Sequence, residues 1–176
     1  MKYQDCVEPA QAPDGISGGW AADARLADAN INPLTGLATD YLNHFNEAVM
    51  LLEMLPSCPD CIEDFLAWQP LSYRAHFEAS HFKGRNLAIA AYEAANPDLR
   101  QGLDALSATM TAMLQATAAA LRSGLPPEAG GLIAEAAAAW LKPLIARAGA
   151  LINGDAERAQ DSAPQAVIDG LMQRSA

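Results

Sequence analysis

Apolar side chains recur at intervals of three and four residues through most of the chain, the spacing that gathers them on one face of an α-helix. This periodicity predicts four long helices, over residues 39–55, 72–95, 97–122 and 128–152. No segment shows a sustained two-residue alternation of β-branched residues, which would predict a strand. With a short helix ending near Trp68 and another after Pro164, the sequence predicts an all-α fold, a bundle of five to six helices.

Prolines, glycines and capping residues predict where these helices begin and end. Pro56 ends the first long helix, because proline cannot continue the helical hydrogen-bond ladder. Asn96 suits the capping position of the third helix, and Pro97 suits its first turn. Gly84 lies inside the second predicted helix and is expected to bend or divide it.

Residues 1–38 lack a lasting apolar period and are rich in proline and glycine. We therefore expect two regions, an irregular N-terminal arm over residues 1–38 and a helical bundle domain over residues 39–176.

The composition agrees with a folded protein and indicates a compartment. Hydrophobic residues make up 51% of the 176 residues and charged residues 18%, which excludes a compositionally disordered chain. The first residues lack the apolar run of a secretory signal. The longest uncharged stretch, residues 105–121, is too short and too polar to span a bilayer comfortably. We expect a cytoplasmic protein without a membrane partner.

The charge of the chain is concentrated in its first third. The net charge is −10, and residues 1–64 hold eleven acidic and two basic residues. A surface without a basic stripe argues against nucleic acid as a partner. An acidic, solvated surface that keeps the protein soluble explains this pattern best.

Each of the three histidines directly precedes a phenylalanine, and two of them share a longer pattern. Residues 41–45 and 73–77 both read Tyr-x-x-His-Phe. The pattern is either a faint internal repeat of a helix pair or a coincidence over five positions.

Histidines and carboxylates spaced three apart are candidate metal ligands. Glu47 follows His44 by three residues and Glu78 precedes His81 by three, so each pair would share one helix face. Two facing helices would then present two imidazoles and two carboxylates to zinc or iron, with a divalent metal as the cofactor. The alternative interpretation places the histidines at the margin of the core, hydrogen-bonded to tyrosine or backbone.

The segment around the second pattern is the only locally basic stretch, and it is a candidate ligand site. A phosphate or carboxylate there would meet guanidinium and imidazole donors. The basic residues could equally pair with acids of residues 1–64. The candidate ligand-binding residues are Tyr41, Tyr73, Arg74, His76 and Arg85.

The chain has three cysteines, Cys6, Cys58 and Cys61. An odd, small number in a cytoplasmic protein predicts reduced thiols rather than a disulfide framework. The spacing of Cys58 and Cys61 nevertheless matches redox motifs, in which one thiol has a lowered pKa. The alternative is two incidental thiols in a loop.

No phosphate-binding loop, dinucleotide fingerprint, nucleophile elbow or zinc-protease motif is present. The leading hypothesis is a non-catalytic helical-bundle protein that binds a small molecule or a protein and forms a homodimer through apolar helix surface. The second hypothesis is a metal-dependent bundle enzyme that uses zinc or iron at the His/Glu cluster. The fold alone does not decide between them.

Overall fold

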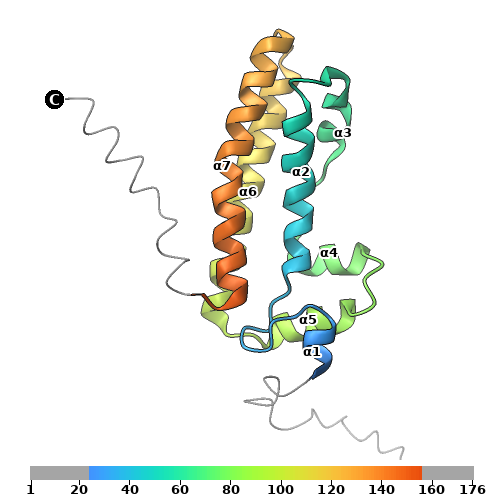
Figure 1. Cartoon of the computed structure of the whole chain (residues 1–176), viewed down its shortest axis with the longest axis vertical. Coiled ribbons are helices and arrows are strands. Elements are labelled where there is room, and N and C mark those ends of the chain that lie inside the picture. Colours follow the sequence, from blue (N-terminus) through green and yellow to red (C-terminus); the bar gives the residue numbers. More distant parts are fainter. Residues whose placement is uncertain (1–23, 156–176) are drawn as a thin grey trace, which may run out of the picture.

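Three long helices run side by side along the molecule, and shorter helices close its side and its base (Figure 1). The computed structural model describes residues 24–155. In chain order its helices are α1 (Ala24–Asp28), η2 (Thr39–Leu42), α2 (Asn43–Met54), η3 (Pro59–Cys61), α3 (Ile62–Ala67), α4 (Tyr73–Ala79), α5 (Arg85–Ala94), α6 (Pro97–Arg122) and α7 (Pro127–Asn153). One isolated antiparallel bridge, Ile31 to Ala38, is the only β-type pairing within these residues. The predicted all-α fold is confirmed.

Local chemistry places the ends of the two longest helices. The Asn96 side-chain oxygen accepts the backbone N–H of Asp98 at 2.8 Å, so it caps α6 as the sequence predicts. Gly154 ends α7 in the left-handed conformation, with φ at +78°. α7 packs against both α6 and α2, and this three-helix contact carries most of the core.

The helix predicted over 72–95 is two helices in the structure. α4 ends at Ala79, Ser80 turns into an extended conformation, and α5 begins after Gly84. A Cβ at Gly84 would lie 2.8 Å from the Cβ of Ala29, closer than such atoms pack. The close approach of Ala29, directly after α1, therefore explains why glycine stands at this break.

Residues 24–38 belong to the same core as the bundle. The side chains of Leu26, Ile31 and Leu37 are fully buried. The Thr35 hydroxyl donates to the backbone oxygen of Ile152 at 2.6 Å, which ties this segment to the end of α7. The hydrophobic core therefore extends across residue 38, where the sequence predicted the end of the arm. The rest of the predicted arm, Cys6 and the predicted helix after Pro164 lie outside the described residues.

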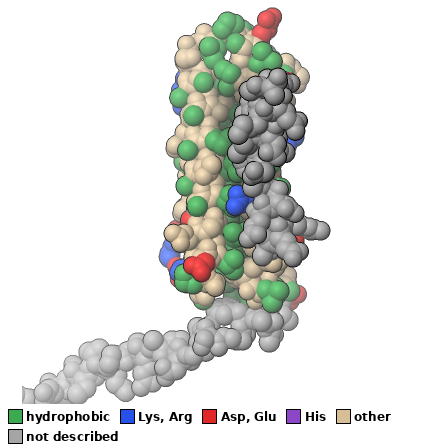
Figure 2. Space-filling model, turned by 90° about the vertical axis from the view of Figure 1, so that its left-hand side faces the viewer, with side chains coloured by type: hydrophobic (Ala, Val, Ile, Leu, Met, Phe, Trp, Pro, Cys, Tyr) green, Lys and Arg blue, Asp and Glu red, His purple; other side chains and the backbone are tan. Residues whose placement is uncertain are grey.

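α7 presents an apolar face to solvent. Leu132 is 68% exposed and Trp140 53%. Between and beyond them, Ala136, Ala139 and Pro143 are exposed as well. Figure 2 views this side of the molecule, where hydrophobic side chains are frequent and charged groups few. Within residues 24–155, α7 alone has the length and apolar composition to cross a bilayer, a criterion that core helices also meet.

Candidate functional site

The two Tyr-x-x-His-Phe segments meet in space. One spans η2 and the first turn of α2, and the other forms the first turns of α4. The ring centroids of Tyr41 and Tyr73 are 5.1 Å apart, and those of His44 and His76 are 6.0 Å apart. The repeated pattern in the sequence thus corresponds to one aromatic junction at the base of the bundle.

His44 holds the segment between α3 and α4 against α2. Its Nε2 accepts the backbone N–H of Leu71, and its backbone oxygen accepts the indole N–H of Trp68, both at 3.1 Å. The imidazole also stacks on the Trp68 indole, with ring centroids 4.6 Å apart. Burial, and then the nearby His76, lower the pKa of His44 to about 4. His44 is therefore a neutral structural group at neutral pH.

His76 lies on the other side of the same junction. Its ring meets Tyr41 edge-on, with centroids 5.7 Å apart. Burial lowers the pKa of His76, and the neighbouring Asp40 partly opposes that shift. One carboxylate oxygen of Asp40, Oδ2, is buried and has no hydrogen-bond partner within the described residues.

Tyr73 and Tyr92 carry the junction toward α6. The Tyr73 hydroxyl accepts the backbone N–H of Ala38 at 2.9 Å, and its ring stacks on Tyr92 with centroids 4.4 Å apart. The Tyr92 hydroxyl donates to both carboxylate oxygens of Asp104, at 2.7 and 2.8 Å. Burial raises the pKa of both tyrosines, and Asp104 adds to the effect at Tyr92. Both phenols are therefore neutral hydrogen-bonding groups.

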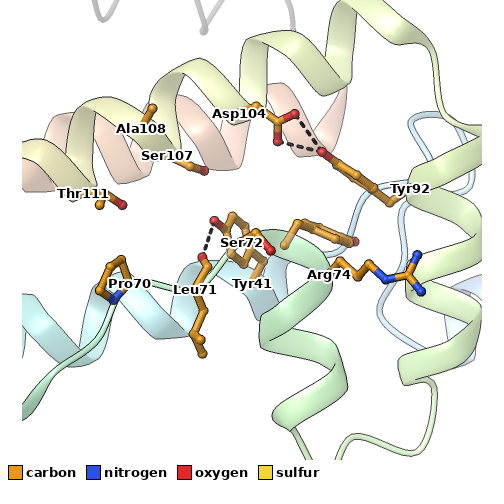
Figure 3. Close-up of a pocket in the computed structure, with 11 residues that line it drawn as sticks. Tyr41, Pro70, Leu71, Ser72, Arg74, Tyr92, Asp104, Ser107, Ala108 and Thr111 are labelled. Carbon is orange, nitrogen blue, oxygen red and sulfur yellow. Dashed lines mark hydrogen bonds between the residues drawn. The ribbon is translucent and has the colours of Figure 1, made fainter.

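These side chains border an open pocket of about 470 Å³, which we call the tyrosine pocket (Figure 3). This volume is within the range of small-molecule sites. Its floor is the aromatic junction, one wall is the segment 70–72, and the opposite wall is α6. The lining residues are Tyr41, Pro70, Leu71, Ser72, Tyr73, Arg74, Tyr92, Asp104, Ser107, Ala108 and Thr111.

The tyrosine pocket has one guanidinium, that of Arg74, and one carboxylate, that of Asp104, among its lining residues. Arg74 stands at the rim, and its guanidinium extends away from α6 (Figure 3). Its Nε donates to Glu78 at 2.8 Å and its Nη1 to Glu93 at 2.6 Å. Among the residues that the structure describes, Arg74 thus pairs with acids of α4 and α5 and not with those of residues 24–64. Asp104 is the carboxylate that lines the pocket itself.

The five candidate ligand-binding residues are only partly brought together. Tyr41, Tyr73 and Arg74 line the tyrosine pocket, and His76 lies next to Tyr41 beneath it. Arg85 is separate, since its guanidinium donates to the backbone oxygen of Ser80 at 3.4 Å in the α4–α5 turn.

The four candidate metal ligands do not form one site. Within residues 24–155, no group of three or more His, Cys, Asp or Glu side chains is arranged to hold a metal ion. α4 ends before His81, so Glu78 and His81 do not share a helix face as the spacing predicted. Glu78 pairs with Arg74, His44 accepts from Leu71, and His81 borders a separate hollow beside α1. Glu47 is exposed on α2. His44 agrees instead with the alternative interpretation, a histidine at the margin of the core that is hydrogen-bonded to backbone.

The prediction of reduced thiols is corrected at Cys58 and Cys61. The two sulfur atoms form a disulfide, and their Cα atoms are 5.6 Å apart. The loop between α2 and α3 turns tightly there, because Pro59 begins the short helix η3. The spacing that resembles a redox motif is therefore also a spacing at which the two cysteines reach each other.

The polar wall contributed by α6 was missed in the sequence. Asp104, Ser107 and Thr111 follow one another at intervals of three and four, so they lie along one side of the helix. That spacing was a usable signal, but the apolar stripe of the same helix dominates the segment.

Comparison with known protein families, curated protein sequences and solved structures finds no match. The functional argument therefore depends on the geometry of the site.

Proposed function

We propose that the protein is a non-catalytic helical-bundle protein that binds a small organic cation in the tyrosine pocket and forms a homodimer through α7. The observation that carries the binding proposal is the convergence of Asp104, three tyrosines and a wall of hydroxyls on one pocket of about 470 Å³. Ligand pockets typically combine apolar walls with a few placed polar groups.

The polar groups of the pocket favour a ligand that donates hydrogen bonds. Asp104 accepts from Tyr92, but a carboxylate has about four lone-pair positions, so it can accept from a ligand too. Ser107 and Thr111 extend the same wall with hydroxyl groups. A primary or secondary ammonium group fits this arrangement, because it donates two or three hydrogen bonds to one anionic and several neutral acceptors.

Charge supports a cationic rather than an anionic ligand. The guanidinium of Arg74 is neutralised by Glu78 and Glu93 at the rim. The net charge of −10 adds a negative field that attracts cations and repels anions. The apolar walls at Pro70 and Ala108 would cover the carbon skeleton of the ligand.

The proposed dimer forms through the solvent-exposed apolar face of α7, which packs against the same face of a second copy of the chain. The small side chains of Ala136, Ala139 and Pro143 would allow close approach of two helices. Trp140, 53% exposed, would supply the large apolar contact that such interfaces use.

The charges along α7 favour an antiparallel pair. Glu135 and Lys142 are both exposed and lie on one edge of this face. A twofold axis near Ala139 would place Glu135 of each copy beside Lys142 of the other. Lys142 already contacts Glu53 of its own chain, and an ammonium group has three donors with which to serve both carboxylates.

Isothermal titration calorimetry tests the binding proposal. The probes are 1,4-diaminobutane and, as an anion of similar size, succinate. We expect measurable binding of diaminobutane, no binding of succinate, and a loss of at least tenfold in affinity for Asp104→Asn. Asp98→Asn removes the same charge from an exposed position of α6 outside the pocket and should bind like the wild type. Preferential binding of succinate would contradict the proposal.

A further inference from the structure

A second chemical feature lies at the opposite end of the bundle and plays no part in the binding proposal. Cys58 and Cys61 join in a disulfide in the loop between α2 and α3. We propose that this pair is a redox-active site that exchanges its disulfide with a dithiol of a partner protein. The pair would alternate between a closed disulfide and two free thiols.

The disulfide contributes little as a structural staple. It links residues only three apart in sequence, and a disulfide stabilises less as the loop that it closes becomes shorter. The loop has other anchors. The backbone N–H of Cys58 donates to Met54 at 2.8 Å, and that of Cys61 donates to the oxygen of Cys58 at 3.0 Å. Since neither bond involves sulfur, the loop can keep its shape in both redox states.

The two cysteines are accessible to a reactant. Both are half-buried, and Pro59 and Asp60 between them are exposed. In a reducing compartment, where we expect this protein, disulfides are mostly transient and serve catalysis or sensing. An accessible pair with a short closed loop fits that role better than a permanent cross-link.

The exchange balances with a dithiol as the co-reactant. A thiolate of the partner attacks one sulfur of the pair, forms a mixed disulfide and releases the other cysteine as a thiolate, which takes a proton from solvent. The second partner thiol loses its proton and attacks the partner's own sulfur in the mixed disulfide. The remaining cysteine of the pair leaves as a thiolate and is protonated. The partner ends as a disulfide, and two electrons and two protons have moved to the pair.

An apolar cavity of about 220 Å³ begins beside the disulfide and provides a docking place for the partner. Its lining residues include Pro59, Ile62, Leu121, Leu125 and Pro127. Pro59 directly follows Cys58 and Ile62 directly follows Cys61, so the lining of the cavity begins one residue from each cysteine.

Charge around the cavity defines the partner's chemistry. Exposed carboxylates neighbour the lining residues in sequence at Asp60, Glu63 and Glu128, against one guanidinium at Arg122, which donates to the oxygen of Leu66. The fitting occupant is therefore a cysteine-bearing segment with an apolar residue next to its cysteine and basic residues around it.

Redox equilibration tests the pair itself. The full chain with Cys6→Ser is incubated in mixtures of reduced and oxidised dithiothreitol, and free thiols are counted by alkylation and mass spectrometry while circular dichroism follows the helices. We expect two thiols to appear together and reversibly with helicity unchanged. A disulfide that opens only when helicity is lost, or that never forms in oxidised dithiothreitol, would overturn the proposal.

Rates with two probes test the docking cavity. The first probe is glutathione, and the second is a reduced synthetic peptide with two cysteines flanked by leucine and arginine. Leu125→Asp should slow reduction by the peptide at least fivefold and leave the rate with glutathione unchanged. Ala112→Asp, at an exposed position of α6, should change neither rate. Equal effects of Leu125→Asp on both probes, or no effect on either, would overturn the docking proposal.

Single-cysteine variants test the chemical step. In the Cys6→Ser background, Cys58→Ser and Cys61→Ser each leave a single cysteine. A mixed disulfide formed at that cysteine cannot be broken by attack of the other cysteine, which has been replaced. At least one of them should accumulate a mixed disulfide when treated with the disulfide-linked dimer of a one-cysteine form of the same peptide, because the displaced peptide thiol diffuses away. If neither variant traps that adduct, the exchange proposal is wrong.

Discussion

The imidazole of His44 stacks on the indole of Trp68, with ring centroids 4.6 Å apart and planes inclined by 24°. The same imidazole accepts the backbone N–H of Leu71 at 3.1 Å through Nε2. One buried histidine therefore joins α2 to the segment that forms a wall of the tyrosine pocket. Because Nε2 must be unprotonated to accept, this connection depends on pH.

Acidification should weaken the fold through His44. The pKa of His44 is lowered from 6.5 to about 4 in the folded protein, so the unfolded chain binds more protons between these values. Its contribution to stability is present above pH 6.5 and is lost as the pH falls toward 4, by at most about 3 kcal/mol. The lowered pKa of His76 acts in the same direction. Urea denaturation between pH 7.5 and 4.5 measures the effect.

Variants separate this contribution from that of the carboxylates, which also protonate on acidification. His44→Gln should lower the stability at pH 7.5 and flatten its decline toward pH 4.5. His81→Gln, at an exposed position after α4, should leave the wild-type slope. An unchanged slope in His44→Gln would contradict the assignment.

Removal of a tyrosine hydroxyl oxygen should lower the unfolding free energy more where its hydrogen-bond partner is buried than where the partner is exposed. Tyr73→Phe leaves the buried N–H of Ala38 without its acceptor, which should cost about 1–3 kcal/mol of unfolding free energy. Tyr92→Phe deletes the same atom where its partner Asp104 is exposed, and should cost less than about 1 kcal/mol. Chemical denaturation of both variants measures the difference. Equal costs would show that the Tyr73 hydroxyl has no special role.

The proposed dimer should dissociate when a cation is placed at its twofold axis. Ala139→Arg brings two guanidinium groups together and should shift the protein to monomer at micromolar concentration, as sedimentation velocity would show. Ala112→Arg, exposed on α6, should leave the dimer intact. The variants Glu135→Lys and Lys142→Glu should each weaken association, and the double variant should restore it. A wild-type monomer, or binding of the wild type to lipid vesicles through α7, would contradict the dimer.

The periodic positions of the sequence were sufficient to predict the long helices. Apolar residues at intervals of three and four, with Asn96 and Pro97 at a boundary, place α6 where the structure has it. The division of residues 72–95 into α4 and α5 agrees with the bend or break expected at Gly84, but the contact with Ala29 that requires glycine there could not be predicted. Such contacts between distant segments leave no local pattern in a sequence.

The candidate site was predictable only in part. The two Tyr-x-x-His-Phe segments pointed to Tyr41 and Tyr73, which meet in the structure. The metal hypothesis assumed that one helix continues through His81, and it lost its geometric basis where α4 ends at Ala79. Asp104 was missed because the apolar stripe of α6 dominates its segment, and because its partner, Tyr92, lies on a different helix.

The most direct test of the binding proposal is a two-dimensional ¹H–¹⁵N nuclear magnetic resonance titration of the protein with 1,4-diaminobutane. The account predicts saturable shifts of the backbone amides of Ser72, Tyr92, Asp104, Ser107 and Thr111, and their loss in Asp104→Asn. Amides near Cys58 and along the outward face of α7 should stay in place. Shifts that do not saturate, or that spread over acidic surface positions without these five amides, would contradict a cation site in the tyrosine pocket.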